Sequence, residues 1–316
     1  MFRRSAQNPI LTAADMPFPA NSVFNPGATQ LPDGDVVLLV RIEDRRGLSS
    51  IHVARSADGI TNWLVDPEPL LQPDETQISW QWGFEDARVS FVDELDRYVI
   101  TCTAYGPPGP CVYLAITTDF GSIEQGSIVI PPEDKNAALF PRRVNGQWLL
   151  LHRPVVATSG AADIWMSRSP DDLESWRHPQ QVMTRRPGGW WDAARIGIGP
   201  PPIETSEGWL LIYHGVRSTM SGAIYRVGGA LLDLDEPWVV RQRCDQWLLS
   251  PTEPYERTGD VGNVVFPCGA VHRPDDDRLD IYYGGADTVV CHASASISEL
   301  VDHLVSPDSG TANSEV

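Results

Sequence analysis

The segment Trp148-Leu149-Leu150-Leu151-His152-Arg153 is a short apolar run that ends in two polar residues. Four other segments have the same form, an apolar run that ends in polar or aromatic residues: residues 37–41, 98–103, 209–214 and 279–283. The starts of the five segments are separated by 61, 50, 61 and 70 residues. Runs of this length that are rich in Leu, Ile and Val are typical of buried β-strands.

A second strand-like segment follows each of these runs, at residues 51–55, 112–116, 163–167, 223–227 and 289–293. Turn-forming residues stand just before several of the first runs, as in Pro32-Asp33-Gly34 and Asn145-Gly146. Such residues readily adopt the backbone conformations that tight hairpin connections require. Each unit is therefore predicted to be an antiparallel β-meander.

Five such units predict an all-β fold, a five-bladed β-propeller formed by residues 1–305. A pair of packed β-sheets is the alternative, because it also contains regular hairpins. Residues 296–305 predict one short helix. Residues 306–316 are rich in Ser, Asp, Gly and Asn, and they predict a disordered tail.

A propeller encloses ligands at its axis, where the ends of the innermost strands surround a central channel. If the five apolar runs are these innermost strands, their polar ends converge on one pocket. The residues expected to line that pocket are then Arg41, His152, Arg153, His214 and Tyr283.

The formal net charge of −18 argues against nucleic acid or an anionic membrane as a partner, because an acidic surface repels both. No apolar run approaches the roughly 18 to 20 residues of a membrane span. The first nine residues lack the apolar stretch of a secretory signal, so a cytoplasmic protein is expected. The five cysteines have neither paired nor metal-ligand spacing and are expected to be buried free thiols.

The stretch Gly83-Phe84-Glu85-Asp86-Ala87-Arg88-Val89 places two carboxylates and an arginine among apolar residues. Strand alternation puts Asp86 and Arg88 on one face and Glu85 on the other. Burial raises the pKa of a carboxyl group and a neighbouring arginine lowers it, and this balance tunes a general acid. A buried Asp–Arg pair that braces two blades is the structural alternative.

Basic residues number 24, and the only lysine among them is Lys135. It is followed by Asn136, and the sequence later contains Arg195 and His214 beside segments rich in glycine and proline. Lys135, Arg195 and His214, with Asn136 as a neutral donor, would form a compact cationic set of donors suited to an oxyanion such as phosphate. Taken one at a time, they are ordinary surface residues.

The ordered set of motifs resembles glycoside hydrolase family 130 over nearly the whole chain. The matching stretches are residues 23–28, 41–49, 83–89, 135–141, 152–154, 197–202, 208–216, 255–256, 263–269 and 282–287. The resemblance implies a five-bladed propeller that cleaves β-mannosides with phosphate and releases α-mannose 1-phosphate with inversion. It also implies that Asp86 is the general acid, acting through the O3 hydroxyl of the mannosyl unit.

The resemblance assigns phosphate binding to Lys135, Asn136, Arg195 and His214, and sugar contacts to Asn25, Arg41 and Asp287. Arg88, Arg153 and Tyr283 are further candidates for substrate binding. Two residues depart from the common family pattern: Ala87 stands where many members have proline, and Arg195 stands where many have lysine. The second departure keeps the charge and changes its geometry.

The expected partners are a β-mannoside oligosaccharide and inorganic phosphate as co-substrate, with no metal and no organic cofactor; a homo-oligomer is compatible with these features. Two alternatives stay open. A hydrolase of the same family would need a second carboxylate as base, for which Glu204 and Asp192 are candidates. A non-catalytic propeller could instead stack sugars on Trp80, Trp82, Trp190 and Trp191.

Overall fold

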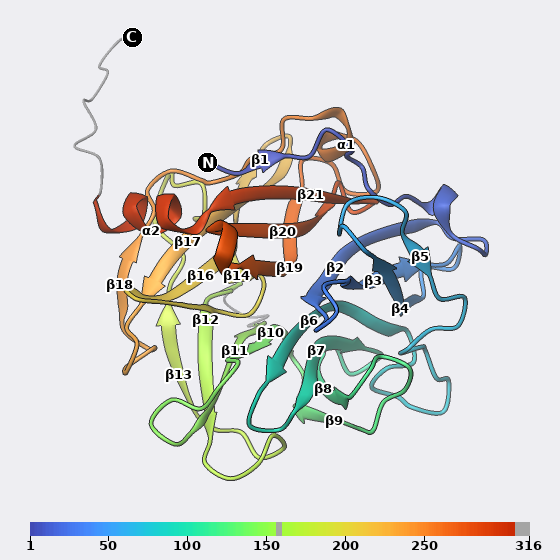
Figure 1. The fold of residues 1–316 in the computed structure, drawn as a ribbon, viewed down its shortest axis with the longest axis horizontal. Helices are drawn as coiled ribbons and strands as arrows, with labels where there is room; N and C mark the ends of the chain where they lie inside the picture. Colours follow the sequence, from blue (N-terminus) through green and yellow to red (C-terminus); the bar gives the residue numbers. More distant parts are fainter. Residues whose placement is uncertain (156–159, 307–316) are drawn as a thin grey trace.

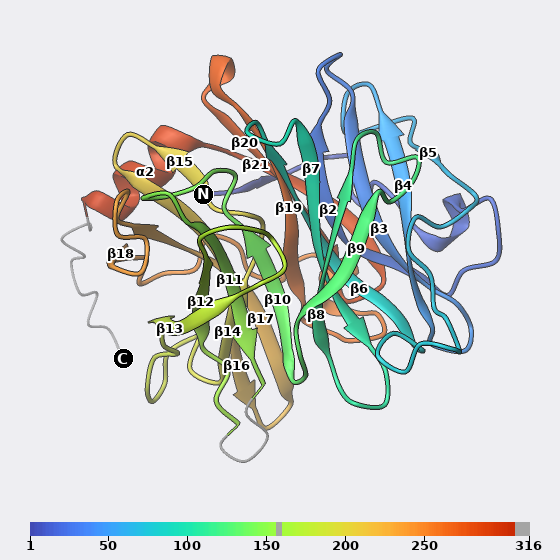
Figure 2. The same ribbon diagram turned by 90° about the horizontal axis from the view of Figure 1, so that it is seen from below.

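The computed structural model describes residues 1–155 and 160–306. Antiparallel β-meanders are arranged around a common axis, with the strands β2, β6, β10, β14 and β19 nearest the centre (Figure 1). The view turned by 90° shows strands that run along this axis (Figure 2). The fold is a five-bladed β-propeller, as predicted.

The blades follow one another in chain order, and in each the innermost strand comes first, except that the N-terminal strand β1 belongs to blade 5. Blade 1 contains β2 (Ser22–Gln30), β3 (Val36–Glu43), β4 (Ser49–Ser56) and β5 (Leu64–Val65). Blade 2 contains β6 (Gly83–Val92), β7 (Arg97–Tyr105), β8 (Cys111–Thr117) and β9 (Gln125–Ile130). Blade 3 contains β10 (Asp134–Leu139), β11 (Trp148–Pro154), β12 (Ile164–Ser169) and β13 (Arg177–Met183). Blade 4 contains β14 (Arg195–Ile198), β15 (Ile203–Thr205), β16 (Gly208–Thr219), β17 (Gly222–Leu232) and β18 (Val240–Arg243). Blade 5 contains β19 (Val265–Arg273), β20 (Arg278–Gly285), β21 (Val289–Ser296) and β1 (Arg3–Arg4).

The N-terminus completes the last blade. Strand β1 pairs with β21, with Arg3 opposite Ser294 and Arg4 opposite Ala293. Blade 5 therefore contains strands from both the N-terminal and the C-terminal parts of the chain. Blades 1 and 2 share a parallel bridge between Ser49 and Gly83, which makes them one continuous sheet.

The apolar runs identified from sequence are strands in every blade, namely β3, β7, β11, β16 and β20, and each is followed by the second predicted strand. The expectation that these runs are the innermost strands was wrong, because each lies second from the axis in the sheet of its blade. The second strands have both faces covered by protein, which explains their uninterrupted apolar character. The innermost strands are interrupted by the polar residues that face the axis.

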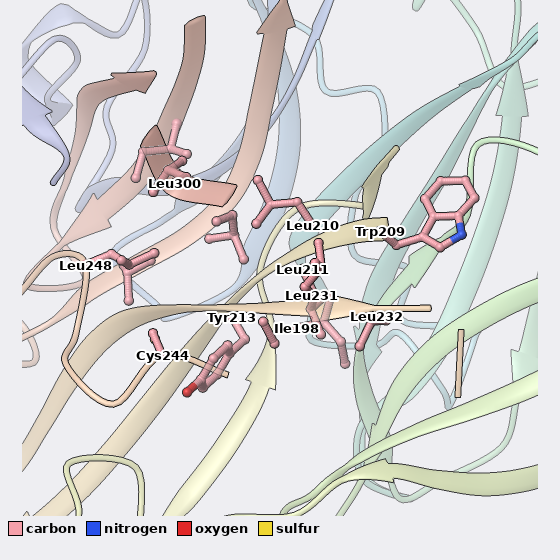
Figure 3. Close-up of a cluster of buried hydrophobic side chains, with 14 of the residues drawn as sticks. Ile198, Trp209, Leu210, Leu211, Tyr213, Leu231, Leu232, Cys244, Leu248 and Leu300 are labelled. Atoms are coloured by element: carbon pink, nitrogen blue, oxygen red, sulfur yellow. The ribbon is translucent and has the colours of Figure 1, made fainter. Parts of the chain in front are cut away.

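The predicted C-terminal helix is confirmed as α2 (Ile297–Val305), and the Ser296 side chain caps it by accepting a hydrogen bond from the Glu299 N–H. Its apolar face covers blade 4, where Leu300 joins Leu248 and the strand residues in one buried cluster (Figure 3). The other helical elements are short: α1 (Pro254–Arg257) and 3₁₀ turns at Ala13–Asp15 and Pro274–Asp276. Beyond Ser306, the predicted tail lies outside the described residues.

All five cysteines are buried and unpaired, as predicted: Cys102, Cys111, Cys244, Cys268 and Cys291. In the described part of the chain, no helix has the length and apolar character needed to cross a membrane. Across the same residues, no three His, Cys, Asp or Glu side chains come together as a metal-binding group would require.

Candidate active site

A cavity of about 140 Å³ lies where the innermost strands begin. Its lining residues come from all five blades: Asn25, Arg41, Glu85, Asp86, Lys135, Asn136, Arg153, Arg195, His214, Tyr225, Val264, Phe266 and Asp287. Residues near the N-terminal ends of the innermost strands meet residues near the C-terminal ends of the second strands. The residues predicted from sequence to bind substrate or line the pocket are all in this lining, except Arg88, His152 and Tyr283.

A β-bulge in each of the first three innermost strands turns a polar side chain toward the axis. Asn25, Asp86 and Asn136 have left-handed backbone conformations, with φ angles of 46°, 52° and 56°. Each lies where the pairing register with the next strand shifts. Asn and Asp tolerate this conformation better than most residues, although it costs of order 1–3 kcal/mol. The same local device thus recurs in blades 1, 2 and 3.

The bulge corrects the expected arrangement around Asp86. Simple alternation put Glu85 on the opposite face, but the register shifts between Glu85 and Arg88, and both Glu85 and Asp86 line the cavity. A strand with a bulge no longer presents alternate residues to alternate faces. The cavity therefore receives two consecutive carboxylates from one strand.

Asp86 is almost completely buried, and only one of its oxygens is engaged. Oδ1 accepts hydrogen bonds from Asn25 Nδ2 at 2.9 Å and from Arg41 Nη1 at 3.1 Å. Oδ2 bonds to no residue that the structure describes. Burial raises the pKa of Asp86, but the charges of Arg41, Arg88 and Lys135 outweigh it and hold the pKa below its usual value. Oδ2 is thus free to meet a ligand.

Arg41 organises the carboxylates of this wall. Besides Asp86, its Nη2 atom contacts Glu85 Oε1 at 3.1 Å and Glu43 Oε1 at 2.5 Å. Asp287 lies just after β20 in the same wall, and burial together with the charge of Asp86 raises its pKa to about 7. We call the side of the cavity formed by blades 1, 2 and 5, which carries Arg41, Glu85, Asp86 and Asp287, the acidic wall.

The opposite side, formed by blades 3 and 4, is basic. Lys135, Arg153 and Arg195 line it, and none of the three contacts a carboxylate among the described residues. Burial, reinforced by the charge of Arg195, lowers the pKa of Arg153 to about 10. Burial also lowers the pKa of Lys135, with the charge of Arg153 acting in the same direction and that of Glu85 opposing it. Clustered cations without counter-ions, in a chain of net charge −18, mark an anion site.

Two neutral groups, His214 and Asn136, complete this basic wall. Burial and the neighbouring cations hold the pKa of His214 well below its usual value, so the prediction of a cationic His214 is corrected to a neutral imidazole. His214 Nε2 lies 3.5 Å from Asn136 Nδ2, while His214 Nδ1 and Asn136 Oδ1 are buried and have no hydrogen-bond partner in the described part of the chain. A side chain at Gly197 would collide with both groups, since its Cβ would lie 2.6 Å from the His214 ring nitrogen and 2.8 Å from the Asn136 amide.

Arg88 lies beneath the cavity instead of lining it. Its guanidinium donates to the backbone carbonyls of Ile198 at 3.0 Å and Gly199 at 3.1 Å, and to that of Asp86. Because Ile198 ends β14, Arg88 connects the innermost strands of blades 2 and 4 across the axis. This placement agrees with the bracing alternative considered from sequence, except that the bracing partners are carbonyls and not the Asp86 carboxylate.

Tyr283 and His152 are also outside the lining. The Tyr283 hydroxyl donates to Glu256 Oε1 at 2.8 Å, deep inside blade 5. His152 bonds to Asp134 Oδ2 at 2.7 Å and to Ser167 Oγ at 3.0 Å, inside blade 3. Neither residue is positioned to contact a ligand in the cavity, because a polar residue at the end of a strand can face a neighbouring blade instead of the axis.

Besides Glu85, three lining residues were missed by the sequence analysis: Tyr225, Val264 and Phe266. The Phe266 ring lies 4.4 Å from the His214 ring, measured between centroids, and the Tyr225 ring lies 6.3 Å away. These groups supply the apolar surface that accompanies polar donors in sugar sites. Phe266 lies in a stretch that matches the family, but nothing in the sequence shows that this stretch is an innermost strand.

A polar cavity on the axis of a five-bladed propeller, with a buried carboxylate facing a basic wall, is the arrangement of a glycoside-active propeller enzyme. The family profile described as beta-1,4-mannooligosaccharide phosphorylase matches residues 6–306. The chain therefore belongs to glycoside hydrolase family 130, a family of β-mannoside phosphorylases, as the motifs predicted.

Individual relatives agree with this assignment. The chain is 38% identical over 312 residues to the beta-1,4-mannooligosaccharide phosphorylase of Ruminococcus albus, covering 96% of this chain and 90% of that protein. The solved structure of beta-1,2-mannobiose phosphorylase from Listeria innocua, in complex with beta-1,2-mannobiose, has a TM-score of 0.87 at 30% identity and covers 96% of this chain and 99% of its own. The catalytic domain of a GH62 α-L-arabinofuranosidase from Coprinopsis cinerea shares only the fold, with a TM-score of 0.63 at 9% identity over 93% of this chain and 96% of its own.

Proposed function

We propose that the protein catalyses the inverting phosphorolysis of β-mannosides, releasing α-mannose 1-phosphate and the shortened acceptor. The observation that carries this proposal is the division of the cavity into two walls. One wall holds a buried carboxylate with an oxygen that no described residue contacts, and the other holds cations that have no carboxylate partner within residues 1–155 and 160–306. A glycosidic bond placed between them would have an acid on one side and a bound anion on the other.

In this reaction Asp86 acts as the general acid. The bond from the anomeric carbon to the acceptor oxygen breaks, and a bond from the same carbon to a phosphate oxygen forms. The proton of Asp86 reaches the departing oxygen, and the proton of hydrogen phosphate restores the carboxylic acid, so the protons balance. Lys135, Arg153, Arg195, His214 and Asn136 hold phosphate in line with the departing oxygen, which is a positioning effect.

The charges of the cavity link phosphate binding to the protonation of Asp86. In the free protein, the cations outweigh burial and hold the pKa of Asp86 below its usual value. A bound phosphate dianion would offset the cations of the basic wall and raise the pKa of Asp86. Asp86 would then be protonated in the phosphate complex, in which it acts as the general acid.

A mannoside hydrolase is the second candidate, and it would need a carboxylate base opposite the acid. Neither of the two candidates from sequence lines the cavity. Asp192 is buried against Arg243 at 2.6 Å and Tyr213 at 2.9 Å, and Glu204 pairs with Arg142 at 2.6 Å on the surface. The lining carboxylates, Glu85, Asp86 and Asp287, all belong to the acidic wall. These placements favour phosphate as the nucleophile.

The linkage follows from a panel of acceptors, because the relatives named above act on β-1,4 and β-1,2 mannosides. The protein would be incubated with α-mannose 1-phosphate and glucose, mannose, N-acetylglucosamine or a mannooligosaccharide, and phosphate release would be followed. We expect release with one class of acceptor and a loss of about 10² to 10⁴ in rate for Asp86→Asn. Near-normal turnover by Asp86→Asn would contradict the proposed role of this residue.

A further inference from the structure

Two large aromatic side chains are left uncovered beside the cavity. Trp82 is 39% exposed and Tyr105 is 38% exposed, and their rings meet edge to face with centroids 5.0 Å apart. Within residues 1–155 and 160–306, neither the indole N–H nor the Tyr105 hydroxyl has a hydrogen-bond partner. Exposed aromatic groups that keep an unused polar atom are characteristic of binding surfaces.

The pair is fixed at the rim of the acidic wall. Tyr105 ends β7 opposite Gly83, two positions along the sheet from Glu85, which is roughly 7 Å at about 3.3 Å per residue. The Trp82 carbonyl accepts from the Ser49 N–H at 3.1 Å. Ser49 Oγ accepts in turn from Arg41 Nε at 3.0 Å, and Arg41 holds Asp86. A short chain of contacts thus connects the aromatic rim to the general acid.

The proposed reaction decides which side of the cavity the acceptor occupies. In an inverting displacement, the attacking phosphate and the departing oxygen lie on opposite sides of the anomeric carbon. The basic wall belongs to blades 3 and 4, so the acceptor must lie on the side of the acidic wall. Trp82 and Tyr105 lie at the rim of that wall.

We propose that Trp82 and Tyr105 form a sugar-binding subsite for the acceptor side of a β-mannoside. The apolar face of a pyranose ring packs on the indole, and the Tyr105 hydroxyl and the indole N–H bond to the sugar hydroxyls. This inference rests on the proposed function, because the acceptor is assigned to the acidic wall only if phosphate binds at the basic wall.

Blade 4 offers a competing surface. A groove there is lined by Trp190, Arg217, Arg226 and Trp247, and Trp247 is 42% exposed. Arg226 covers one face of the Trp247 ring at 4.4 Å from its centroid. This groove lies on the same side as the basic wall, so an in-line reaction would not direct the acceptor to it. A substitution of Trp247 therefore distinguishes an acceptor bound at the acidic wall from one bound in this groove.

The test compares Trp82→Ala and Tyr105→Ala with two control variants. Phe91→Ala removes an aromatic residue of similar exposure, 38%, from the far end of β6, the strand that begins directly after Trp82; there Phe91 contacts Tyr98 at 4.9 Å between centroids. Trp247→Ala removes the competing platform. We expect the KM for the acceptor to rise about tenfold for the rim variants, a change equivalent to about 1.4 kcal/mol. The KM for α-mannose 1-phosphate and the rate at saturating acceptor should stay within about twofold, and Trp82→Phe should restore most of the acceptor affinity.

Calorimetric titration with β-1,4- and β-1,2-mannobiose tests the same subsite without turnover. Binding by the wild type and weaker binding by Trp82→Ala would support the subsite even if the protein transferred no mannose to phosphate. Four results would overturn it: no binding by the wild type, unchanged affinity in both rim variants, a KM effect confined to Trp247→Ala, or a change in molar mass by light scattering with unchanged sugar affinity. The last result would make the rim a contact between copies of the chain.

Discussion

Asp287→Asn tests the electrostatics of the acidic wall. In the folded protein, burial and the charge of Asp86 raise the pKa of Asp287 from 3.8 to about 7. A group with a raised pKa in the folded state contributes stability below its unfolded pKa, and this contribution is lost as the pH rises through the folded pKa. Each pKa unit corresponds to 1.36 kcal/mol, so the shift of about 3 units is worth about 4 kcal/mol.

The assay is urea unfolding at several pH values between 5 and 8. About two pKa units lie between pH 5 and the folded pKa of Asp287, about 7. As the pH rises through this range, the free energy of unfolding of the wild type should therefore fall by about 3 kcal/mol relative to that of Asp287→Asn, whose amide does not ionise. Asp245→Asn, with a side chain that is 74% exposed, provides the matched control and should follow the wild type. Parallel stability curves for the wild type and Asp287→Asn would refute the reasoning.

Further predictions concern the basic wall and the floor of the cavity. Lys135→Met should raise the KM for phosphate about 10- to 100-fold, because it removes one charged donor, and leave β-mannobiose affinity unchanged in calorimetry. Reductive methylation should inactivate the protein at Lys135, the only lysine of the chain, and phosphate should protect against it; inactivation that phosphate does not slow would place the anion elsewhere. Arg88→Met should lower the free energy of unfolding by about 3 kcal/mol in urea titrations, since it leaves three buried carbonyls without their donor. Arg46→Met, at a side chain that is 74% exposed, should change stability by less than about 0.5 kcal/mol, and an equal effect of the two changes would contradict the bracing role of Arg88.

The strands of the propeller could be predicted because burial on both faces leaves a clear mark in sequence. The run from Trp148 to Leu151 becomes β11, and the same holds for the corresponding run in each of the other blades. The innermost strands carry no such mark. In β10, Lys135 and Asn136 interrupt the apolar pattern because they face a cavity and not a core. Sequence patterns therefore locate the blades but do not show which strand is nearest the axis.

The resemblance to the family named most of the residues that line the cavity, and their roles stay predictions, but their surroundings could not be predicted. The bulge at Asp86 brings Glu85 into the cavity, and strand alternation cannot anticipate it. The neutral state of His214 depends on its burial and on cations from four other strands. Arg88 finds its partners in β14 and in the residue after it, about a hundred positions away. Such long-range contacts fix the charge and orientation of each group only after folding.

The requirement for phosphate is the most direct test of the proposed function. Purified protein would be incubated with β-1,4- or β-1,2-mannobiose, with and without inorganic phosphate, and the products followed by proton and phosphorus NMR. Formation of α-mannose 1-phosphate only when phosphate is present is the predicted result. Release of free mannose at the same rate without phosphate would contradict it and identify the protein as a hydrolase.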